Sequence, residues 1–144
     1  MMSGVLALTV AAIFTGAAVY VNVAEQPARL SLDDRALLAE WKRSYKRGAM
    51  MQASIALVGC VLGLIAWWQT SQTGFLVGAI AMVAPWPWTL LAIKPTNDAL
   101  LATQSDQAGP QTRALIVKWG ALHGVRTALG ALATIAFLWS CMPR

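Results

Sequence analysis

Charged residues are scarce in this chain. Only 12% of its 144 residues are Asp, Glu, Lys or Arg, whereas soluble domains carry about 25%. Hydrophobic residues make up 58% of the chain and the mean hydropathy is +0.58. These values exclude an ordinary soluble domain and favour an integral membrane protein. The length suits one membrane domain that covers residues 1–144.

Metal-binding and redox side chains are also few. The chain has two cysteines, Cys60 and Cys141, without a CxxC spacing, and one histidine, His123. A zinc cluster or a thiol redox motif is therefore not expected, because a metal centre usually needs about three protein ligands. We predict no cofactor, while a bound metal or quinone stays open. The net charge of +5 does not predict nucleic-acid binding, since the basic residues lie in connections between apolar segments.

Long apolar runs make up most of the remaining sequence. The first covers about residues 4–24, which as a helix measures about 31 Å and would cross the hydrocarbon core of a bilayer. It lacks a basic n-region, so we expect a retained helix rather than a cleaved signal peptide. The other runs cover about 49–68, 74–93 and 114–139. The sequence therefore predicts an all-α bundle of four transmembrane helices.

A charged stretch, SLDDRALLAEWKRSYKRG, separates the first two runs. Leu37, Leu38, Trp41 and Tyr45 fall on one helical face, and basic residues lie beside them. This pattern predicts an amphipathic helix over about 32–47 that either lies on the membrane surface or packs across the mouth of the bundle.

The basic residues predict the orientation in the membrane. Both long connections carry them, whereas the opposite side has only Arg144. The positive-inside rule then places both long connections in the cytoplasm and both termini outside it. We expect a location in the bacterial inner membrane. The basic residues on the cytoplasmic side are Arg29, Arg35, Lys42, Arg43, Lys46, Arg47, Lys94, Arg113 and Lys118.

Polar side chains gather near the cytoplasmic ends of all the apolar runs. If Lys118 marks the membrane interface, His123 lies about 7 Å deep and Arg126 about 12 Å deep. An unpaired arginine at bilayer depth costs about 2.5–3.5 kcal/mol, so Arg126 should face the bundle interior. We predict an ion pair between Arg126 and Glu25, with His123 beside it. The gathered residues are Asn22, Glu25, Gln52, Asn97, His123 and Arg126.

Two prolines, Pro85 and Pro87, interrupt the third run. They remove backbone donors and should kink the helix about two turns before its cytoplasmic end. Irregular backbone at membrane depth is tolerated only where protein or a cavity covers it. Together with Trp86, Trp88 and Trp119, the prolines predict an aromatic-walled pocket that opens toward the cytoplasmic leaflet.

The chain resembles the anthrone-oxygenase-like family of small four-helix membrane proteins, many of which have no assigned function. The resemblance covers nearly the whole chain and keeps the order of its elements. It is carried by GAAVYVNVAEQPARL, WKRSYKRGAMMQ, PWPWTLLAIKPTNDALL and WGALHGVRTALG. Family members in aromatic polyketide pathways oxidise anthrones to anthraquinones with dioxygen. The recurrent positions are Glu25, Pro27, Trp41, Tyr45, Pro95, Asn97, Trp119, His123 and Arg126.

The resemblance implies an oxygenase or oxidoreductase that acts on a hydrophobic aromatic molecule. Removal of the acidic C–H of an anthrone gives a delocalised carbanion that can pass an electron to dioxygen. This chemistry needs a general base, for which His123 or Glu25 is suited, and a positive group for the oxyanion, for which Arg126 is suited. The expected substrate contacts are Asn22, Tyr45, Gln52, Trp88, Asn97 and Trp119.

Other interpretations of the polar cluster stay open. The cluster could hold the helices together, or it could cradle a quinone or a lipid headgroup in a non-catalytic subunit of a larger membrane complex. A transporter is disfavoured, because the polar residues gather in one leaflet instead of crossing both. The expected partners are the lipid bilayer and a hydrophobic small molecule, and the sequence leaves a homo-oligomer or a larger complex open.

Overall fold

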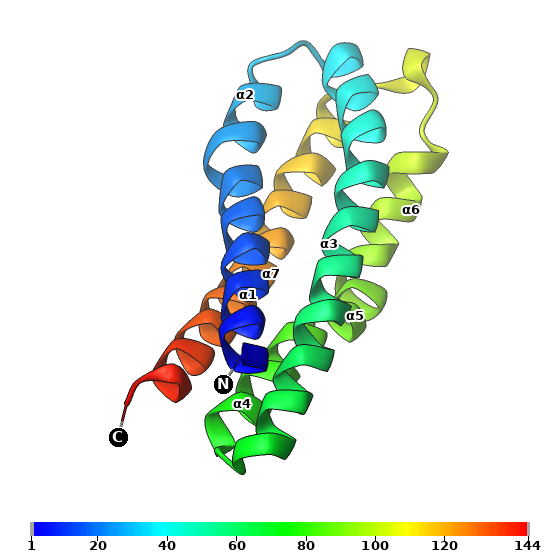
Figure 1. Ribbon diagram of the computed structural model, residues 1–144. Coiled ribbons are helices and arrows are strands. Elements are labelled where there is room, and N and C mark those ends of the chain that lie inside the picture. Colours follow the sequence, from blue (N-terminus) through cyan, green and yellow to red (C-terminus); the bar gives the residue numbers. More distant parts are fainter. Residues whose placement is uncertain (1, 144) are drawn as a thin grey trace.

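The computed structural model describes residues 2–143 and consists of four long helical rods packed side by side (Figure 1). The first rod contains α1 (Met2–Tyr20), the π-helical η1 (Val21–Glu25) and α2 (Gln26–Leu30). The second is α3 (Asp34–Thr70). The third contains α4 (Thr73–Val83), α5 (Pro85–Trp88), the π-helical η2 (Thr89–Ile93) and α6 (Lys94–Ala102). The short 3₁₀ turn η3 (Ser105–Gln107) then leads to the fourth rod, α7 (Pro110–Cys141).

The predicted all-α bundle of four helices is confirmed, and each rod is long and apolar enough to cross a membrane. Neighbouring rods run in opposite directions, so α1 begins and α7 ends at the same end of the bundle (Figure 1). We name this the termini end. The other end, which we name the loop end, carries the connections at 31–33 and 103–109. Arg144, which entered the predicted orientation, lies outside the described residues.

The stretch predicted as a separate amphipathic helix is the first half of α3. This 37-residue helix runs unbroken through Gly48, so the predicted segments 32–47 and 49–68 form one rod. Asp33 caps its start, because its side chain accepts hydrogen bonds from the first free backbone N–H groups. Trp41 is fully buried against the other rods. The stretch therefore extends the bundle instead of lying on the membrane surface or across the mouth.

Two π-helical segments interrupt the first and third rods, and each ends two residues before a proline. Proline has no N–H, and its ring clashes with the carbonyl four residues earlier, so a regular α-helix cannot continue there. Before Pro27, the N–H of Gln26 donates to Val21, and η2 ends in the same way before Pro95. The widened turn removes the clash and keeps the helix continuous. Such π segments are frequent at functional sites.

The predicted break at Pro85 and Pro87 is also present. The helix α4 ends at Val83, and the four-residue α5 begins at Pro85. The third rod was predicted to end near residue 93. It continues instead through α6 to Ala102. Pro95 and Asn97 therefore lie within this rod and not beyond its end.

The apolar core is divided into two clusters along the bundle. The cluster at the termini end includes Phe14, Phe75 and Phe137. Its packing depends on small residues, since a Cβ added at Gly63 or Gly78 would lie 2.7 or 2.3 Å from ring atoms of Phe137. The cluster at the loop end consists of Leu37, Leu38, Trp41, Ile93, Leu100, Ile116 and Trp119. Polar side chains from every rod, among them those of Gln52, Thr89 and His123, lie in the layer between these clusters.

Candidate active site

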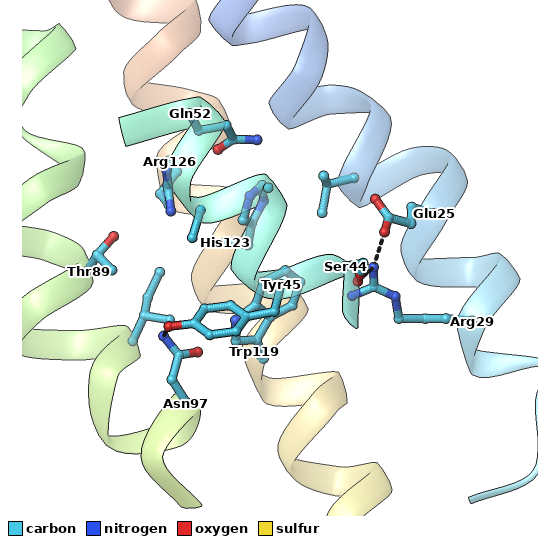
Figure 2. A pocket seen from close by; sticks show the side chains of 14 residues that line it. Glu25, Arg29, Ser44, Tyr45, Gln52, Thr89, Asn97, Trp119, His123 and Arg126 are labelled. Atoms are coloured by element: carbon cyan, nitrogen blue, oxygen red, sulfur yellow. Dashed lines mark hydrogen bonds and ion pairs between the residues drawn. The ribbon is translucent and has the colours of Figure 1, made fainter. Parts of the chain in front are cut away.

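A pocket occupies the layer between the two apolar clusters, and every rod contributes to its wall (Figure 2). The space between its walls, including the part that is open to the outside, is about 470 Å³. The wall consists of Val21, Glu25, Arg29, Ser44, Tyr45, Gly48, Ala49, Gln52, Thr89, Ile93, Asn97, Trp119, His123 and Arg126.

Most of the predicted site residues meet in this pocket, but Asn22 and Trp88 do not line it. Asn22 lies behind His123 and contacts its ring. Trp88 donates its indole N–H to the carbonyl of Leu122 at 3.0 Å, so it links the third rod to α7. The predicted residues in the wall are Glu25, Tyr45, Gln52, Asn97, Trp119, His123 and Arg126.

The ring of His123 is oriented by Asn22. The Asn22 side-chain N–H₂ donates to the carbonyl of Gly120 at 2.9 Å, which fixes the amide and makes its Oδ1 the free acceptor. Thr127 donates to this Oδ1 at 2.8 Å, and His123 Nδ1 lies 2.9 Å from it. Nδ1 must therefore carry the proton. In a neutral imidazole this leaves a lone pair on Nε2, for which the described residues offer no hydrogen-bond partner.

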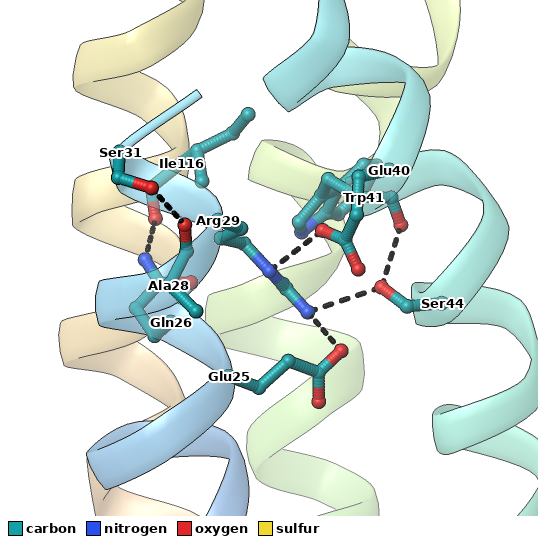
Figure 3. Close-up of polar contacts among 9 residues, drawn as sticks. All are labelled: Glu25, Gln26, Ala28, Arg29, Ser31, Glu40, Trp41, Ser44 and Ile116. Carbon is teal, nitrogen blue, oxygen red and sulfur yellow. Dashed lines mark hydrogen bonds and ion pairs between the residues drawn. The ribbon is translucent and has the colours of Figure 1, made fainter.

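The predicted ion pair between Glu25 and Arg126 is wrong, because Glu25 pairs with Arg29 instead (Figure 3). Arg29 lies one helical turn after Glu25, and its side chain is only 2% exposed. Its Nε lies 2.8 Å from a carboxylate oxygen of Glu40. Its Nη2 donates a hydrogen bond to the hydroxyl of Ser44 at 3.1 Å. A buried guanidinium needs such counter-charges, and Glu25 is on the same helical face.

Arg126 faces the pocket without a carboxylate partner in residues 2–143. It is 7% exposed, and its Nε is buried without a hydrogen bond. The same holds for Gln52 Oε1, Asn97 Oδ1 and Trp119 Nε1 in the wall. Two nitrogens of Arg29 also lack a hydrogen bond, although its Nε lies close to the carboxylate of Glu40. Buried polar atoms are nearly always paired in proteins. The pocket therefore offers both donors and acceptors that a bound molecule would satisfy.

Aromatic rings line the pocket on the side of the loop end. Trp119 stacks on His123 with 5.1 Å between the ring centroids, and the guanidinium of Arg29 lies 5.5 Å from the Trp119 ring. Tyr45 stacks on the buried Trp41 at 4.7 Å and accepts a hydrogen bond from Asn97 at 3.2 Å. These contacts fix the planes of Trp119 and Tyr45. A flat aromatic molecule would fit against them.

Arg29, Ser44 and Thr89 line the pocket but were not predicted as site residues from the sequence. The signal for Arg29 was its position four residues after Glu25, which places both on one face. Ser44 and Thr89 gave no comparable signal. Among residues 2–143, no three His, Cys, Asp or Glu side chains are grouped to hold a metal ion.

Two known proteins are similar to this chain in sequence. The chain is 29% identical over 107 residues to the anthrone oxygenase tpcL of Aspergillus fumigatus. This match covers 69% of this chain and 66% of the relative, so the chain spans slightly less than two thirds of that relative's length. It is 28% identical over 141 residues to an anthrone oxygenase of Claviceps purpurea, which covers 87% of this chain and 80% of the relative. No solved structure matches the chain. The model of the family described as anthrone oxygenase matches residues 41–136, more than half of the sequence, and the chain therefore belongs to the anthrone oxygenase family.

Proposed function

We propose that this protein is a membrane-embedded oxygenase that converts an anthrone-like substrate and dioxygen into an anthraquinone and water. One observation carries the proposal. The unpaired Nε2 of His123 and the unpaired guanidinium of Arg126 belong to residues three apart on α7, and both residues line one aromatic-walled pocket. The names of both fungal relatives support the substrate class.

The first chemical step is the removal of a proton. An anthrone carries a methylene group between two aromatic rings, opposite its carbonyl. His123 Nε2 takes one proton from this methylene and leaves a carbanion whose charge spreads onto the carbonyl oxygen. Glu25 is the weaker candidate for the base, because its carboxylate is held by Arg29.

The second step is the reaction with dioxygen. The carbanion passes one electron to dioxygen, and the two radicals combine to form a C–O bond. The peroxide takes the proton back from His123. His123 then removes the remaining methylene proton, the O–O bond breaks, and the hydroxide that leaves takes this proton to become water. One anthrone and one dioxygen thus give one anthraquinone and one water.

Other wall residues bind the substrate and its developing charge. Arg126 donates to the carbonyl oxygen as this oxygen becomes an oxyanion, which lowers the energy of the transition state. Gln52 Oε1 and Asn97 Oδ1 accept hydrogen bonds from hydroxyl groups of the substrate, and Trp119 packs against its rings. In this proposal the reaction needs no cofactor.

We also propose that the loop end faces the cytoplasm and the termini end faces away from it. The basic residues of the connections support this orientation. Both relatives are fungal, so a bacterial inner membrane stays a prediction that rests on the sequence alone.

The experiment uses the protein in lipid nanodiscs with 1,8-dihydroxyanthrone. Oxygen consumption and anthraquinone absorbance are followed together, and the spontaneous oxidation in empty nanodiscs is subtracted. We expect one dioxygen for each anthraquinone, and loss of the protein-dependent rate in His123→Ala. Leu132→Ala, on the exposed side of α7, is the matched control and should keep the rate.

Two outcomes would overturn the proposal. The first is a wild-type rate no higher than that of empty nanodiscs, and the second is a His123→Ala variant that keeps the full rate. If the wild type binds the anthraquinone without oxidising the anthrone, a quinone-binding subunit becomes the better interpretation.

A further inference from the structure

A second pocket lies beside the first, between α3 and the interrupted part of the third rod. The space between its walls, including the part that is open to the outside, is about 460 Å³. Ala49, Thr89 and Arg126 line both pockets, so the two share one wall. The remaining lining residues are Ala53, Pro85, Trp86 and Leu90.

This pocket opens on the outer surface of the bundle. Leu90 is 60% exposed and Trp86 is 43% exposed, and both belong to a rod that is apolar enough to cross a membrane. A hydrocarbon environment at this surface would accommodate an apolar molecule. The opening therefore faces the place where a hydrophobic aromatic substrate dissolves.

The break in the third rod creates the opening. At Pro85 the chain leaves the regular helix of α4, and the small side chains of Ala49 and Ala53 line the facing surface of α3. One hydrogen bond crosses the gap here, from the indole N–H of Trp86 to the carbonyl of Ala53 at 3.4 Å. This distance is longer than the usual range of about 2.7–3.2 Å for an N–H···O hydrogen bond, so the link is weak.

The walls are apolar except at the inner end, where Arg126 and the hydroxyl of Thr89 lie. A flat, largely apolar molecule with an oxygen on the edge that faces Arg126 matches this arrangement. The loop end is a poorer route, because there the buried Arg29 and the carboxylates of Glu25 and Glu40 lie between the first rod and α3. An apolar molecule would have to disrupt these ion pairs to pass, at a high desolvation cost.

We propose that the second pocket is a binding subsite that admits a flat aromatic substrate from the bilayer and holds its outer ring. The oxygenated edge of the molecule then lies at Arg126, which lines both pockets. The identity of this ligand rests on the proposed function. Trp86 forms the outer wall of the subsite and sets how large a ring system can bind.

The test compares two probes that differ in length. In this proposal the two-ring probe, 1-naphthol, occupies only the first pocket, whereas the three rings of 1,8-dihydroxyanthraquinone extend into the second. Binding to the protein in nanodiscs is measured by calorimetry, with empty nanodiscs as the reference. Ala53→Trp fills the second pocket, and Leu57→Trp, one turn further along α3 and 50% exposed, is the matched control.

We expect Ala53→Trp to weaken the binding of the anthraquinone by about tenfold and to change that of 1-naphthol by less than about twofold. Leu57→Trp should change neither. Trp86→Ala, which removes the outer wall without adding bulk, should also weaken only the larger probe. Equal effects on both probes, equal effects of Ala53→Trp and Leu57→Trp, or no binding of either probe to the wild type would overturn the subsite.

The same samples separate this inference from the proposed function. A wild type that oxidises the anthrone, with Ala53→Trp binding both probes as Leu57→Trp does, refutes the subsite alone. A wild type that binds the anthraquinone in a manner sensitive to Ala53→Trp, but consumes no dioxygen, refutes the oxygenase and leaves the subsite in place.

Discussion

The tautomer of His123 can be tested directly, because it is the only histidine in the chain. Labelling with ¹⁵N-histidine gives a single imidazole in the NMR spectrum, provided that the protein is purified without a histidine tag. The hydrogen bond to Asn22 predicts a protonated Nδ1 and an unprotonated Nε2. In Asn22→Leu, the side chain no longer accepts the hydrogen bond from Nδ1–H. The Nδ1–H form should then no longer be the major tautomer in the spectrum.

The expected loss of activity follows from the same contact. Removing one partner of a buried hydrogen bond costs about 1–3 kcal/mol. If this cost appears in the transition state, kcat falls by about 5- to 150-fold. KM should change little, because Asn22 lies behind His123 and does not line the pocket. Asn22 is thus a positioning residue, and a purely structural role would not change the tautomer.

Two control variants complete this test. Thr127→Val removes the other donor to Asn22 Oδ1 but leaves the acceptor for His123, so kcat should fall by less than about threefold. Asn22→Asp keeps an acceptor and should preserve the Nδ1–H form. A wild-type spectrum with the proton on Nε2 would refute the reasoning, and so would an Asn22→Leu variant with an unchanged kcat.

Three further predictions concern the site charges and the core. Arg126→Gln should lower kcat by about 10²- to 10³-fold in the oxygen-consumption assay, and an unchanged kcat would remove Arg126 from the chemistry. Arg29→Met leaves Glu25 and Glu40 without their common partner and should destabilise the protein by about 1–3 kcal/mol, seen as a lower Tm in detergent. A Tm equal to that of the wild type would show that the ion pairs contribute nothing. Gly78→Ala should cost about 1–3 kcal/mol because the new methyl group collides with Phe137, whereas Gly16→Ala, with nothing within 4 Å of its Cβ, should not lower the Tm.

The helices were predictable from hydropathy, but the continuity of α3 was not recognised. A single glycine, Gly48, costs a helix only about 1 kcal/mol and does not end it when both halves pack. The signal was a stripe of buried and half-buried residues that continues across Gly48, since Tyr45 and Gly48 are half-buried between Trp41 and Gln52. Trp41, Gln52 and Ala56 belong to this stripe, so the residues on both sides of Gly48 share one helical face. Because the first half was predicted as a separate helix, on the membrane surface or across the mouth of the bundle, the contact between Glu40 and Arg29 was not predicted.

The composition of the site was predicted better than its pairing. Depth along a helix follows from residue spacing, and this placed His123 and Arg126 in the same layer as Glu25. The direction of each side chain around its helix depends on how the rods are rotated against one another, which spacing alone does not give. The carboxylate of Glu25 pairs with Arg29, which lies one turn away on the same rod, and not with Arg126. The second pocket also depends on this rotation, although Pro85 marked the place of the break.

The two π-helical segments make the helices around the pocket sensitive to residue deletion. Relative to an α-helix, each π turn contains one extra residue, so deleting a residue from Val21–Glu25 or Thr89–Ile93 would close the turn and bring back the clash at Pro27 or Pro95. It would also rotate everything beyond it by about 100° relative to the rest of the rod. Arg29 and Asn97 would then turn away from the pocket. Length changes in the family should therefore be tolerated in the connection at 103–109 and rejected in these two turns.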